Sequence, residues 1–227
     1  MPSDTSAIHK KSVVALVPIK FNNERLPNKN ILCIDDKPLI SYILNTLQKC
    51  ESIDRICVFC SDKAVVKYLP EGVEFIQRDS SLDESLTKGF DIYEAFSKVV
   101  PADVYVLAHA TSPCITSEKI CEGIRNVVEH GYESSISVKK LMSYCYDEKC
   151  NSINFKNNIL PRTQDLDTMY LGNSAFYIFR RENLEKYKSP VSSCNKFVVC
   201  SEIESIDVDY LYDFKIAKFV IENNIIE

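Results

Sequence analysis

Glycine is scarce in this sequence. The 227 residues include five glycines, and none of them precedes Gly72. The phosphate-binding motifs of P-loop NTPases and of Rossmann dehydrogenases need closely spaced glycines after the first strand, because the backbone must approach the phosphates. Neither motif is present, which argues against both classes. A phosphate bound near the start of the chain would therefore have to be held largely by side chains.

An excess of positive charge and a long apolar segment are also missing. The formal net charge is -5, which argues against general nucleic-acid binding, because that function needs a large positive surface. No apolar run approaches the roughly 20 residues that cross a bilayer. The polar start MPSDTSAIHKK lacks the apolar core of a signal peptide. We therefore expect a cytoplasmic protein with neither a nucleic acid nor a membrane as partner.

Cysteine is frequent, but its ten positions show neither a disulfide framework nor zinc-finger spacing. We expect reduced, mostly buried thiols. Cys57 and Cys60 form an isolated C-x-x-C pair in an apolar run. Residues three apart on a strand point to opposite faces, which argues against a metal shared by this pair.

Apolar blocks typical of strands alternate with segments typical of helices, which is the pattern of an α/β fold with a doubly wound, mostly parallel sheet. The hydrophobic content of 45% is enough for one core, so we predict a single domain over residues 1–227. The expected strands are Val13–Val17, Ile56–Cys60, Val73–Ile76, Val104–Ala108, Ser134–Val138 and Ala175–Phe179. The expected helices are Pro38–Cys50, Asp62–Leu69, Ser85–Val99, Ser117–His130, Arg181–Tyr187 and Leu211–Asn223.

The segment Lys139–Gly172 interrupts this alternation. It is rich in Tyr, Asn, Asp and Lys and has no clear period. We interpret it as an insertion or flap within the domain. Such excursions often cover a ligand or pair with a second subunit, and a plain surface excursion fits the pattern equally well.

The run Val13–Asn30, VVALVPIKFNNERLPNKN, joins a buried strand to a basic loop. Pro18 and Pro27 are expected to keep the residues between them out of regular helix or strand. Asn22 and Asn23 tolerate the left-handed backbone that glycine usually supplies, so we expect the turn of the loop there.

Three cations in this loop, Lys20, Arg25 and Lys29, suit a polyphosphate. Each can form a charge-assisted hydrogen bond with a phosphate oxygen. Many basic loops are simply solvated surface. The position directly after a buried strand favours a ligand site, since open α/β sheets bind ligands beyond the carboxyl ends of their strands.

Two carboxylates, Asp207 and Asp209, are separated by one apolar residue in an extended segment. Strand alternation places both on the same side. Neighbouring carboxylates repel unless a cation lies between them, and hard oxygen ligands favour Mg²⁺ or Mn²⁺. The alternative is that Asp209 caps the helix expected from Leu211.

Other polar residues follow the strand Val104–Ala108, namely His109, Thr111 and Ser112. A single histidine in such a loop is more often structural than catalytic. Within the insertion, Arg162 has a planar guanidinium that suits a carboxylate, although an isolated arginine is usually a surface charge.

These pieces occur in the order found in a known family. The chain resembles the cytidylyltransferases that activate sialic acids and related ulosonic acids, the CMP-N-acylneuraminate synthetase family, with CMP-Kdo synthetase as a close relative. The resemblance extends from about Val13 to Asn223. The segments that carry it are Lys20 through Asn30, Lys37-Pro38-Leu39-Ile40, Thr111-Ser112-Pro113, Arg162 through Asp165, Gly172-Asn173-Ser174-Ala175 and Ser205-Ile206-Asp207-Val208-Asp209.

The resemblance implies a nucleotidyltransferase fold of the GT-A-like type with a dimerisation insertion, and therefore a homodimer. It implies transfer of CMP from CTP to the anomeric hydroxyl of a 2-keto-3-deoxy sugar acid, with release of pyrophosphate. The hydroxyl would attack the α-phosphorus in line, without a covalent enzyme intermediate. Mg²⁺, or Mn²⁺ in its place, would be held by Asp207 and Asp209. CTP and an acidic sugar are the implied partners.

The resemblance also assigns residues to roles. The catalytic residues that it implies are Lys20, Arg25, Lys29 and Asp209. The nucleotide-binding residues are Lys20, Asn22, Asn23, Arg25, Lys29, Asn30, Arg78 and Asp83. The sugar-binding residues are His109, Thr111, Ser112, Arg162, Gln164 and Asn173.

The chain departs from the family pattern at several of these positions. Glu24 aligns with the usual loop lysine, and Arg25, as in the Kdo enzymes, would restore the lost cation. Ser174 replaces a glycine, and His109 replaces a glutamine. These changes concern the identity of the sugar more than the class of reaction.

Two other functions fit parts of the sequence. Asp207-Val208-Asp209 is also the D-x-D of a GT-A-like glycosyltransferase, which consumes a nucleotide sugar, but the cationic first loop favours an enzyme that releases free pyrophosphate. The altered loop also fits a non-catalytic nucleotide-binding homologue.

Overall fold

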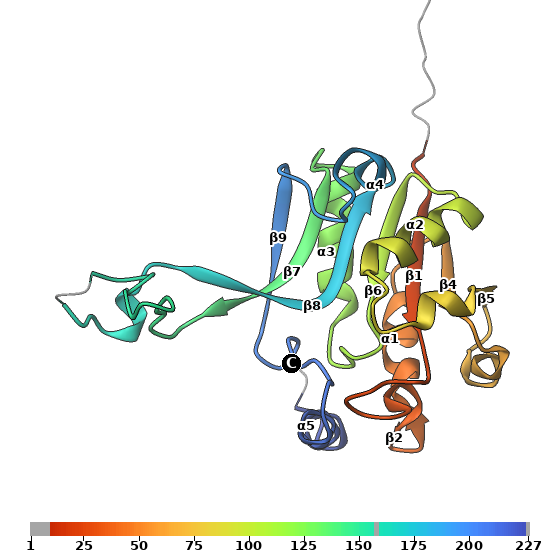
Figure 1. Ribbon diagram of the computed structural model, residues 1–227, viewed down its shortest axis with the longest axis horizontal. Helices are drawn as coiled ribbons and strands as arrows, with labels where there is room; N and C mark the ends of the chain where they lie inside the picture. Colours follow the sequence, from red (N-terminus) through yellow and green to blue (C-terminus); the bar gives the residue numbers. More distant parts are fainter. Residues whose placement is uncertain (1–9, 157–158, 226–227) are drawn as a thin grey trace, which may run out of the picture.

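The computed structural model describes residues 10–156 and 159–225, which fold around a seven-stranded sheet with the order β5-β4-β1-β6-β8-β7-β9 (Figure 1). The strands of this sheet are β1 (Val13–Ile19), β4 (Arg55–Cys60), β5 (Val73–Gln77), β6 (Val104–Ala108), β7 (Ser134–Leu141), β8 (Met169–Arg180) and β9 (Asn195–Cys200). Strands β5, β4, β1 and β6 are parallel, β8 is antiparallel to both of its neighbours, and β9 is parallel to β7. The prediction of an α/β fold with a mostly parallel sheet is confirmed.

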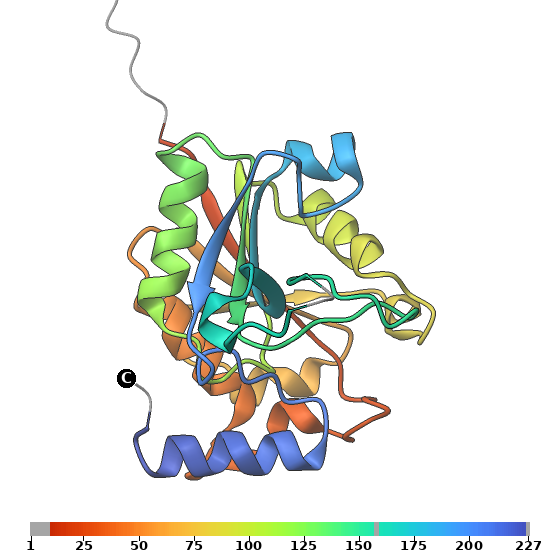
Figure 2. The ribbon, with the colours of Figure 1, turned by 90° about the vertical axis from the view of Figure 1, so that its left-hand side faces the viewer.

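Helices cover both faces of the sheet (Figure 2). They are α1 (Leu39–Gln48), α2 (Gly89–Val99), α3 (Ser117–Val128), α4 (Glu182–Tyr187) and α5 (Leu211–Glu222). Side chains of α1 and α3 share one core cluster with the sheet, and side chains of α2 and α4 share the core on the opposite face. Helix α5 packs instead against the small hairpin of β2 (Cys33–Ile34) and β3 (Lys37–Pro38), at the end of the molecule where β1 terminates (Figure 1).

Strand β1 lies in the middle of the sheet and is almost completely buried, as its apolar sequence predicts. It continues through Pro18 to Ile19, two residues beyond the expected end at Val17. Its pairing with β6 ends at Leu16, whereas its pairing with β4 continues to Ile19. Pro18, which has no N–H to donate, is tolerated there because β1 has a strand partner on one side only.

The two cysteines of the C-x-x-C pair point to opposite faces of β4. Cys57 belongs to the core cluster under α2, and Cys60 belongs to the cluster under α1 and α3. The expectation from strand alternation is therefore confirmed for this pair.

Two expected elements are wrong in type or in bounds, and two elements of the structure were not expected. The segment expected as the helix Asp62–Leu69 is a 3-10 helix, Lys63–Tyr68, in which β-branched residues and the following Pro70 disfavour a longer α-helix. Helix α2 begins at Gly89 instead of Ser85, after a short 3-10 helix at Ser80–Asp83. Strand β9 and the β2–β3 hairpin were not expected at all.

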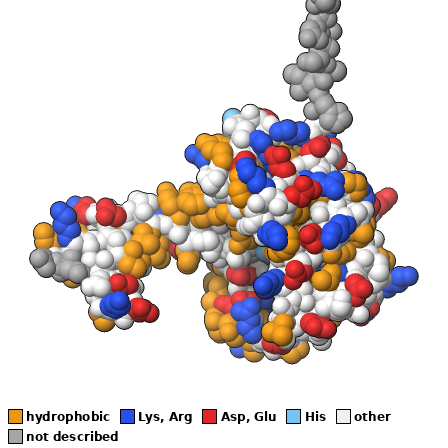
Figure 3. Space-filling model, turned by 45° about the horizontal axis from the view of Figure 1, so that its top comes forward, with side chains coloured by type: hydrophobic (Ala, Val, Ile, Leu, Met, Phe, Trp, Pro, Cys, Tyr) orange, Lys and Arg blue, Asp and Glu red, His pale blue; other side chains and the backbone are white. Residues whose placement is uncertain are grey.

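The insertion is an arm that projects from the body of the molecule (Figure 1). Strands β7 and β8 continue into it, with Leu141 paired to Met169, so part of the segment expected to be irregular is regular sheet. Hydrophobic side chains gather along the arm, whereas charges of both signs are mixed over the body (Figure 3). Among the described residues, no helix has the length and apolar character needed to traverse a membrane.

Candidate active site

Two adjoining cavities lie at the carboxyl ends of β1 and β6. The first, of about 250 Å³, is lined by Lys20, Asn23, Glu24, Arg25, Leu26, Lys29 and Ser85. The second, of about 310 Å³, is lined by Pro18, Ile19, Lys20, Arg78, Leu82, Glu84, Ser85, Thr87, Gly89, Ile92, Tyr93 and His109. Lys20 and Ser85 line both cavities. The region is the edge at which open α/β sheets bind their ligands.

The loop after β1 turns at Asn28, which has a left-handed backbone with φ of 55°. The expectation that Asn22 or Asn23 supplies this turn is wrong, although the residue type is the expected one, because asparagine tolerates this conformation better than most residues. Asn30 is buried, and its Nδ2 donates a hydrogen bond to the carbonyl of Lys20 at 2.9 Å. This bond holds the two ends of the loop together.

Two cations of this loop converge on Asp209. Arg25 Nη1 lies 2.5 Å from Oδ2 of Asp209, and Lys29 Nζ lies 2.8 Å from Oδ1. The Arg25 guanidinium also lies over the ring of Tyr210, 5.6 Å from its centroid. The third cation, Lys20, forms no ion pair within the part of the chain that the structure describes. The loop thus presents one unpaired and two paired cations to the cavities.

Asp207 is half-buried, and its carboxylate is only partly satisfied. Val208 N donates to the Thr111 carbonyl at 2.7 Å. This bond attaches the segment to the loop after β6. The buried Oδ1 of Asp207 has no partner among the described residues. Burial, followed by repulsion from Asp209, raises the pKa of Asp207 above its ordinary value.

Asp209 does not cap α5. The capping carboxylate belongs to Asp213, whose Oδ2 accepts hydrogen bonds from the backbone N–H groups of Asp209 at 3.1 Å and Tyr210 at 2.8 Å. The alternative interpretation of Asp209 as an N-cap is therefore wrong. Its carboxylate is free to serve the loop cations or a ligand.

The carboxylates of Asp207 and Asp209 fit a divalent cation. Carboxylate oxygens are the donors that Mg²⁺ prefers, and the unpartnered Oδ1 of Asp207 is a buried acceptor that such an ion would satisfy. The described residues contain no group of three or more His, Cys, Asp or Glu side chains arranged to hold a metal. Water and ligand oxygens would therefore have to complete the coordination of an ion here.

Arg78 forms part of the wall of the second cavity and is 2% exposed. Its guanidinium donates to the carbonyls of Ile19 at 2.8 Å and Phe59 at 3.3 Å, which joins the ends of β1 and β4. It also forms an ion pair with Asp83, which accepts a further hydrogen bond from the Ser61 hydroxyl. Asp83 lines neither cavity, and its contribution to the site is to hold Arg78.

His109 lines the second cavity from the end of β6. Its Nδ1 lies 2.5 Å from the carbonyl oxygen of Ser174, and burial lowers the pKa of His109 below its ordinary value. Ser112 follows in the same loop and is buried, and its hydroxyl has no partner among the described residues.

Asn173 was expected to bind a sugar, but its amide is engaged within the protein. Nδ2 donates to the Ser205 hydroxyl at 2.9 Å, and Oδ1 accepts from the Ala175 N–H at 3.2 Å. Asn173 therefore supports the segment that leads to Asp207.

The projecting arm contains the short 3-10 helix Thr163–Asp165 (Figure 1). Gln164 lies within this helix, and Arg162 is the N-cap residue that precedes it. Arg162 forms an ion pair with Asp165 at 2.7 Å and is largely exposed. The structure does not bring either residue to the cavities of its own chain. A role for them at a sugar site would require a second copy of the chain.

Sequence reasoning missed one wall of the site, formed by the segment before α2 and by the first turn of that helix. The missed residues are Leu82, Glu84, Ser85, Thr87, Gly89, Ile92 and Tyr93. The signal for a loop was the polar run SSLDESLTKG, which was assigned in part to the expected helix. Asp91, which accepts the N–H of Lys88 at 3.1 Å, marks the true start of α2.

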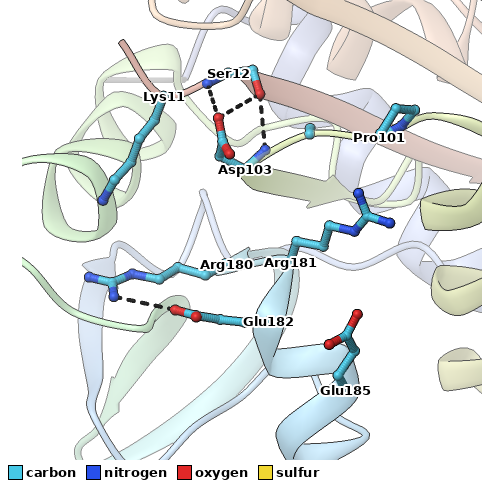
Figure 4. Close-up of a pocket in the computed structure, with 9 residues that line it drawn as sticks. Lys11, Ser12, Pro101, Asp103, Arg180, Arg181, Glu182 and Glu185 are labelled. Atoms are coloured by element: carbon cyan, nitrogen blue, oxygen red, sulfur yellow. Dashed lines mark hydrogen bonds and ion pairs between the residues drawn. The ribbon is translucent and has the colours of Figure 1, made fainter. Parts of the chain in front are cut away.

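A larger cavity, of about 560 Å³, lies at the opposite end of the sheet (Figure 4). Two of its charged side chains are engaged by neighbours. Arg180 pairs with Glu182 at 3.5 Å, and Asp103 accepts two hydrogen bonds from Ser12 at 2.8 and 2.9 Å. Because ligands of open α/β sheets bind at the carboxyl ends of the strands, this cavity is not the candidate active site.

Known proteins resemble this chain along most of its length. It is 24% identical over 187 residues to an N-acylneuraminate cytidylyltransferase of Oncorhynchus mykiss, a match that covers 78% of this chain and 43% of that protein. It is 22% identical over 227 residues to a 3-deoxy-manno-octulosonate cytidylyltransferase of Acaryochloris marina, which covers 91% of this chain and 89% of that protein. The chain spans about half the length of the curated N-acylneuraminate cytidylyltransferases that it matches.

A solved structure has the same fold. The structure of a CMP:2-keto-3-deoxy-manno-octonic acid synthetase complexed with CTP has a TM-score of 0.70 at 16% identity, covering 94% of this chain and 99% of that chain. At this identity the likeness concerns the fold alone. In sequence, a family profile described as Cytidylyltransferase matches residues 14–227. Because that match covers nearly the whole chain, the protein belongs to the cytidylyltransferase family.

Proposed function

We propose that this protein transfers CMP from CTP to the anomeric hydroxyl of a 2-keto-3-deoxy sugar acid and releases pyrophosphate. The observation that carries this proposal is the contact of the first loop with Asp209, a residue near the other end of the chain. The contact places a cationic loop and a carboxylate pair at one edge of the sheet. The fold and the names of the relatives at low identity point to the same chemistry.

The loop cations would hold the triphosphate. Lys20 has no competing ion pair among the described residues, whereas Arg25 and Lys29 would exchange Asp209 for phosphate oxygens when the nucleotide binds. Positive charge at this position would stabilise the negative charge that develops on the departing pyrophosphate. Glu24, which lines the same cavity, opposes this charge unless it stays in solvent.

The remaining residues would bind the nucleoside and the acceptor. Arg78 and Asn30 would form the nucleoside side of the site, and His109, Thr111 and Ser112 would face the acceptor. Mg²⁺ or Mn²⁺ held by Asp207 and Asp209 would neutralise charge on the phosphate oxygens and on the attacking hydroxyl. Val208 N donates to the Thr111 carbonyl and Asn173 Nδ2 donates to the Ser205 hydroxyl, so protein hydrogen bonds hold the segment that carries the carboxylates against β8 and the loop after β6.

A pyrophosphate-release assay tests this proposal. The purified protein is incubated with each of the four nucleoside triphosphates, with Mg²⁺ or Mn²⁺, and with sialic, legionaminic, pseudaminic or Kdo-type acids. We expect release with CTP and one class of acid only, and a loss of release in Lys20→Met. Stabilisation by CTP without release would favour a non-catalytic nucleotide-binding protein, and turnover of a nucleotide sugar would favour a glycosyltransferase. Either result would overturn the proposal.

We also propose that the arm pairs two copies of the chain. Its exposed apolar side chains include Met142, Tyr170 and Leu171, and Tyr170 packs on Phe197 of the edge strand β9 with ring centroids 5.4 Å apart. An exposed apolar surface of this kind is typical of an interaction site. Light scattering should give a dimer at micromolar concentration, and Leu171→Asp should give a monomer. Leu86→Asp, at an exposed leucine outside the arm, is the matched control, and a monomeric wild type would contradict the proposal.

A further inference from the structure

Strand β8 is interrupted beside the site by a bulge. Its pairing with β7 passes from Ile136 opposite Tyr177 to Val138 opposite Gly172, so β8 contains the additional residues. Within this bulge Ser174 has a left-handed backbone with φ of 60°. Serine rarely adopts this conformation, and bulges are common next to active sites, where they redirect a group.

The group that this bulge presents to the site is the Ser174 carbonyl, which lies 2.5 Å from Nδ1 of His109. The backbone N–H of His109 is held by the next residue of the bulge, donating to the Ala175 carbonyl at 3.1 Å. The imidazole also packs edge-on against Tyr177, with centroids 6.2 Å apart. Two contacts therefore fix the ring, and a third fixes the backbone that carries it.

The contact with Ser174 also determines which nitrogen of His109 carries the proton. A carbonyl oxygen only accepts hydrogen bonds, so Nδ1 must be the protonated nitrogen. In the neutral ring Nε2 is then an acceptor with a free lone pair. Burial, which lowers the pKa of His109, favours the neutral ring. Among the described residues, none forms a hydrogen bond with Nε2, and His109 lines the second cavity.

The position of His109 indicates which ligand would donate a hydrogen bond to Nε2. Arg78 lies beneath the ends of β1 and β4, on the nucleoside side. His109 lies instead beside the bulge in which Asn173 supports the Ser205–Asp209 segment, and the charges that affect its pKa are those of Asp207 and Lys29. The acceptor substrate must lie next to the carboxylate pair, because its hydroxyl attacks there in the proposed reaction.

We propose that the Ser174 carbonyl fixes His109 in the Nδ1–H form, so that Nε2 accepts a hydrogen bond from a hydroxyl of the acid substrate and selects acids that carry a hydroxyl at that position. The inference rests on the proposed function. A neutral histidine held in this way offers only an acceptor to the cavity, whereas an amide side chain would offer a donor as well. Acids with only a carbonyl, carboxylate or ether oxygen at that position would be rejected.

Two amide variants separate the two nitrogens. The amide of Asn lies near the position of Nδ1, so His109→Asn keeps a donor for Ser174 but lacks the Nε2 acceptor. The amide of Gln lies near the position of Nε2, so His109→Gln keeps that acceptor. We expect His109→Asn to raise the KM for the acid about tenfold and to leave the KM for CTP nearly unchanged. His109→Gln should remain within about threefold of the wild type.

A larger rise in the KM for the acid with His109→Gln than with His109→Asn would mean that His109 only holds the bulge. An equal rise of the KM values for the acid and for CTP would mean that the hydrogen-bond partner of Nε2 is not specific to the acid. Either result would overturn the inference while pyrophosphate release by the wild type still supported the proposed function. A wild type that releases no pyrophosphate with any acid would overturn both. Nitrogen-15 NMR gives a readout that needs no variant, because the chain has three histidines. We expect an Nδ1–H ring for His109, and an Nε2–H ring would overturn the inference.

Discussion

Replacing Arg25 with alanine should affect catalysis much more than stability. The ion pair with Asp209 joins side chains that are 55% and 27% exposed, and such pairs contribute about 0.2–1 kcal/mol. The contact with the Tyr210 ring adds about 0.5–1 kcal/mol at an exposed site. The free energy of unfolding should therefore fall by no more than about 2 kcal/mol, which corresponds to a decrease in Tm of at most about 8 °C.

In the proposed site, Arg25→Ala would also remove a charged hydrogen bond to the triphosphate, a larger loss of about 1.5–3 kcal/mol. It should lower kcat/KM for CTP by about ten- to 150-fold. Glu24→Ala is the matched control, because Glu24 lines the same cavity and forms no ion pair with any residue in the described ranges. Removing its negative charge should leave CTP use unchanged or improve it. Thermal melting and steady-state pyrophosphate release measure the two quantities, and equal, mild effects of both variants would refute the role of Arg25.

Three further changes test other parts of the site and the core. Asp209→Asn should keep the fold by circular dichroism and lower turnover by at least about a hundredfold, and unchanged turnover at limiting Mg²⁺ would reject the metal assignment. Arg78→Ala leaves Asp83 without its buried partner and should cost about 3–5 kcal/mol in urea unfolding, and a cost below about 1 kcal/mol would contradict that role. A Cβ on Gly123 would lie 2.6 Å from Cδ1 of Ile178. Gly123→Ala should therefore lower the free energy of unfolding by about 1 kcal/mol, after the gain from the higher helix propensity of alanine is taken into account. Ile178→Val in the same chain should recover much of that loss, and no recovery would contradict the predicted steric cause.

The order of elements could be predicted from the sequence because most of the expected strands of the sheet are short apolar blocks. The position of β8 between β6 and β7 could not, since it depends on pairings between residues distant in sequence. Strand β9 did carry a local signal. Its Phe197 and Val199 are exposed, whereas Val198 and Cys200 are buried, which is the alternation of a half-buried strand. The apolar run FVVC concealed that alternation, because all four residues count as hydrophobic.

Only part of the candidate site could be predicted from the sequence. The residue types of the first loop indicated a phosphate site, but the local backbone did not follow from them, because any of its asparagines tolerates the left-handed turn that Asn28 adopts. The engagement of Asn173 with Ser205 is a tertiary contact, and a polar side chain in a motif can serve such a contact as readily as a ligand. The wall before α2 was lost with the misplaced start of that helix, since Ser85 and Thr87 belong to a loop only when α2 begins at Gly89.

The scarcity of glycine explains why the site is distributed over the chain. A glycine-rich loop holds phosphates with backbone N–H groups that are consecutive in sequence. Side-chain cations cannot stand alone in the same way, because three of them in one loop repel each other when no anion is bound. Asp209 supplies the counter-charge to Arg25 and Lys29, and the bonds of Val208 to Thr111 and of Asn173 to Ser205 set its position. The phosphate site that we propose therefore depends on contacts between segments far apart in the sequence, and no short motif identifies it.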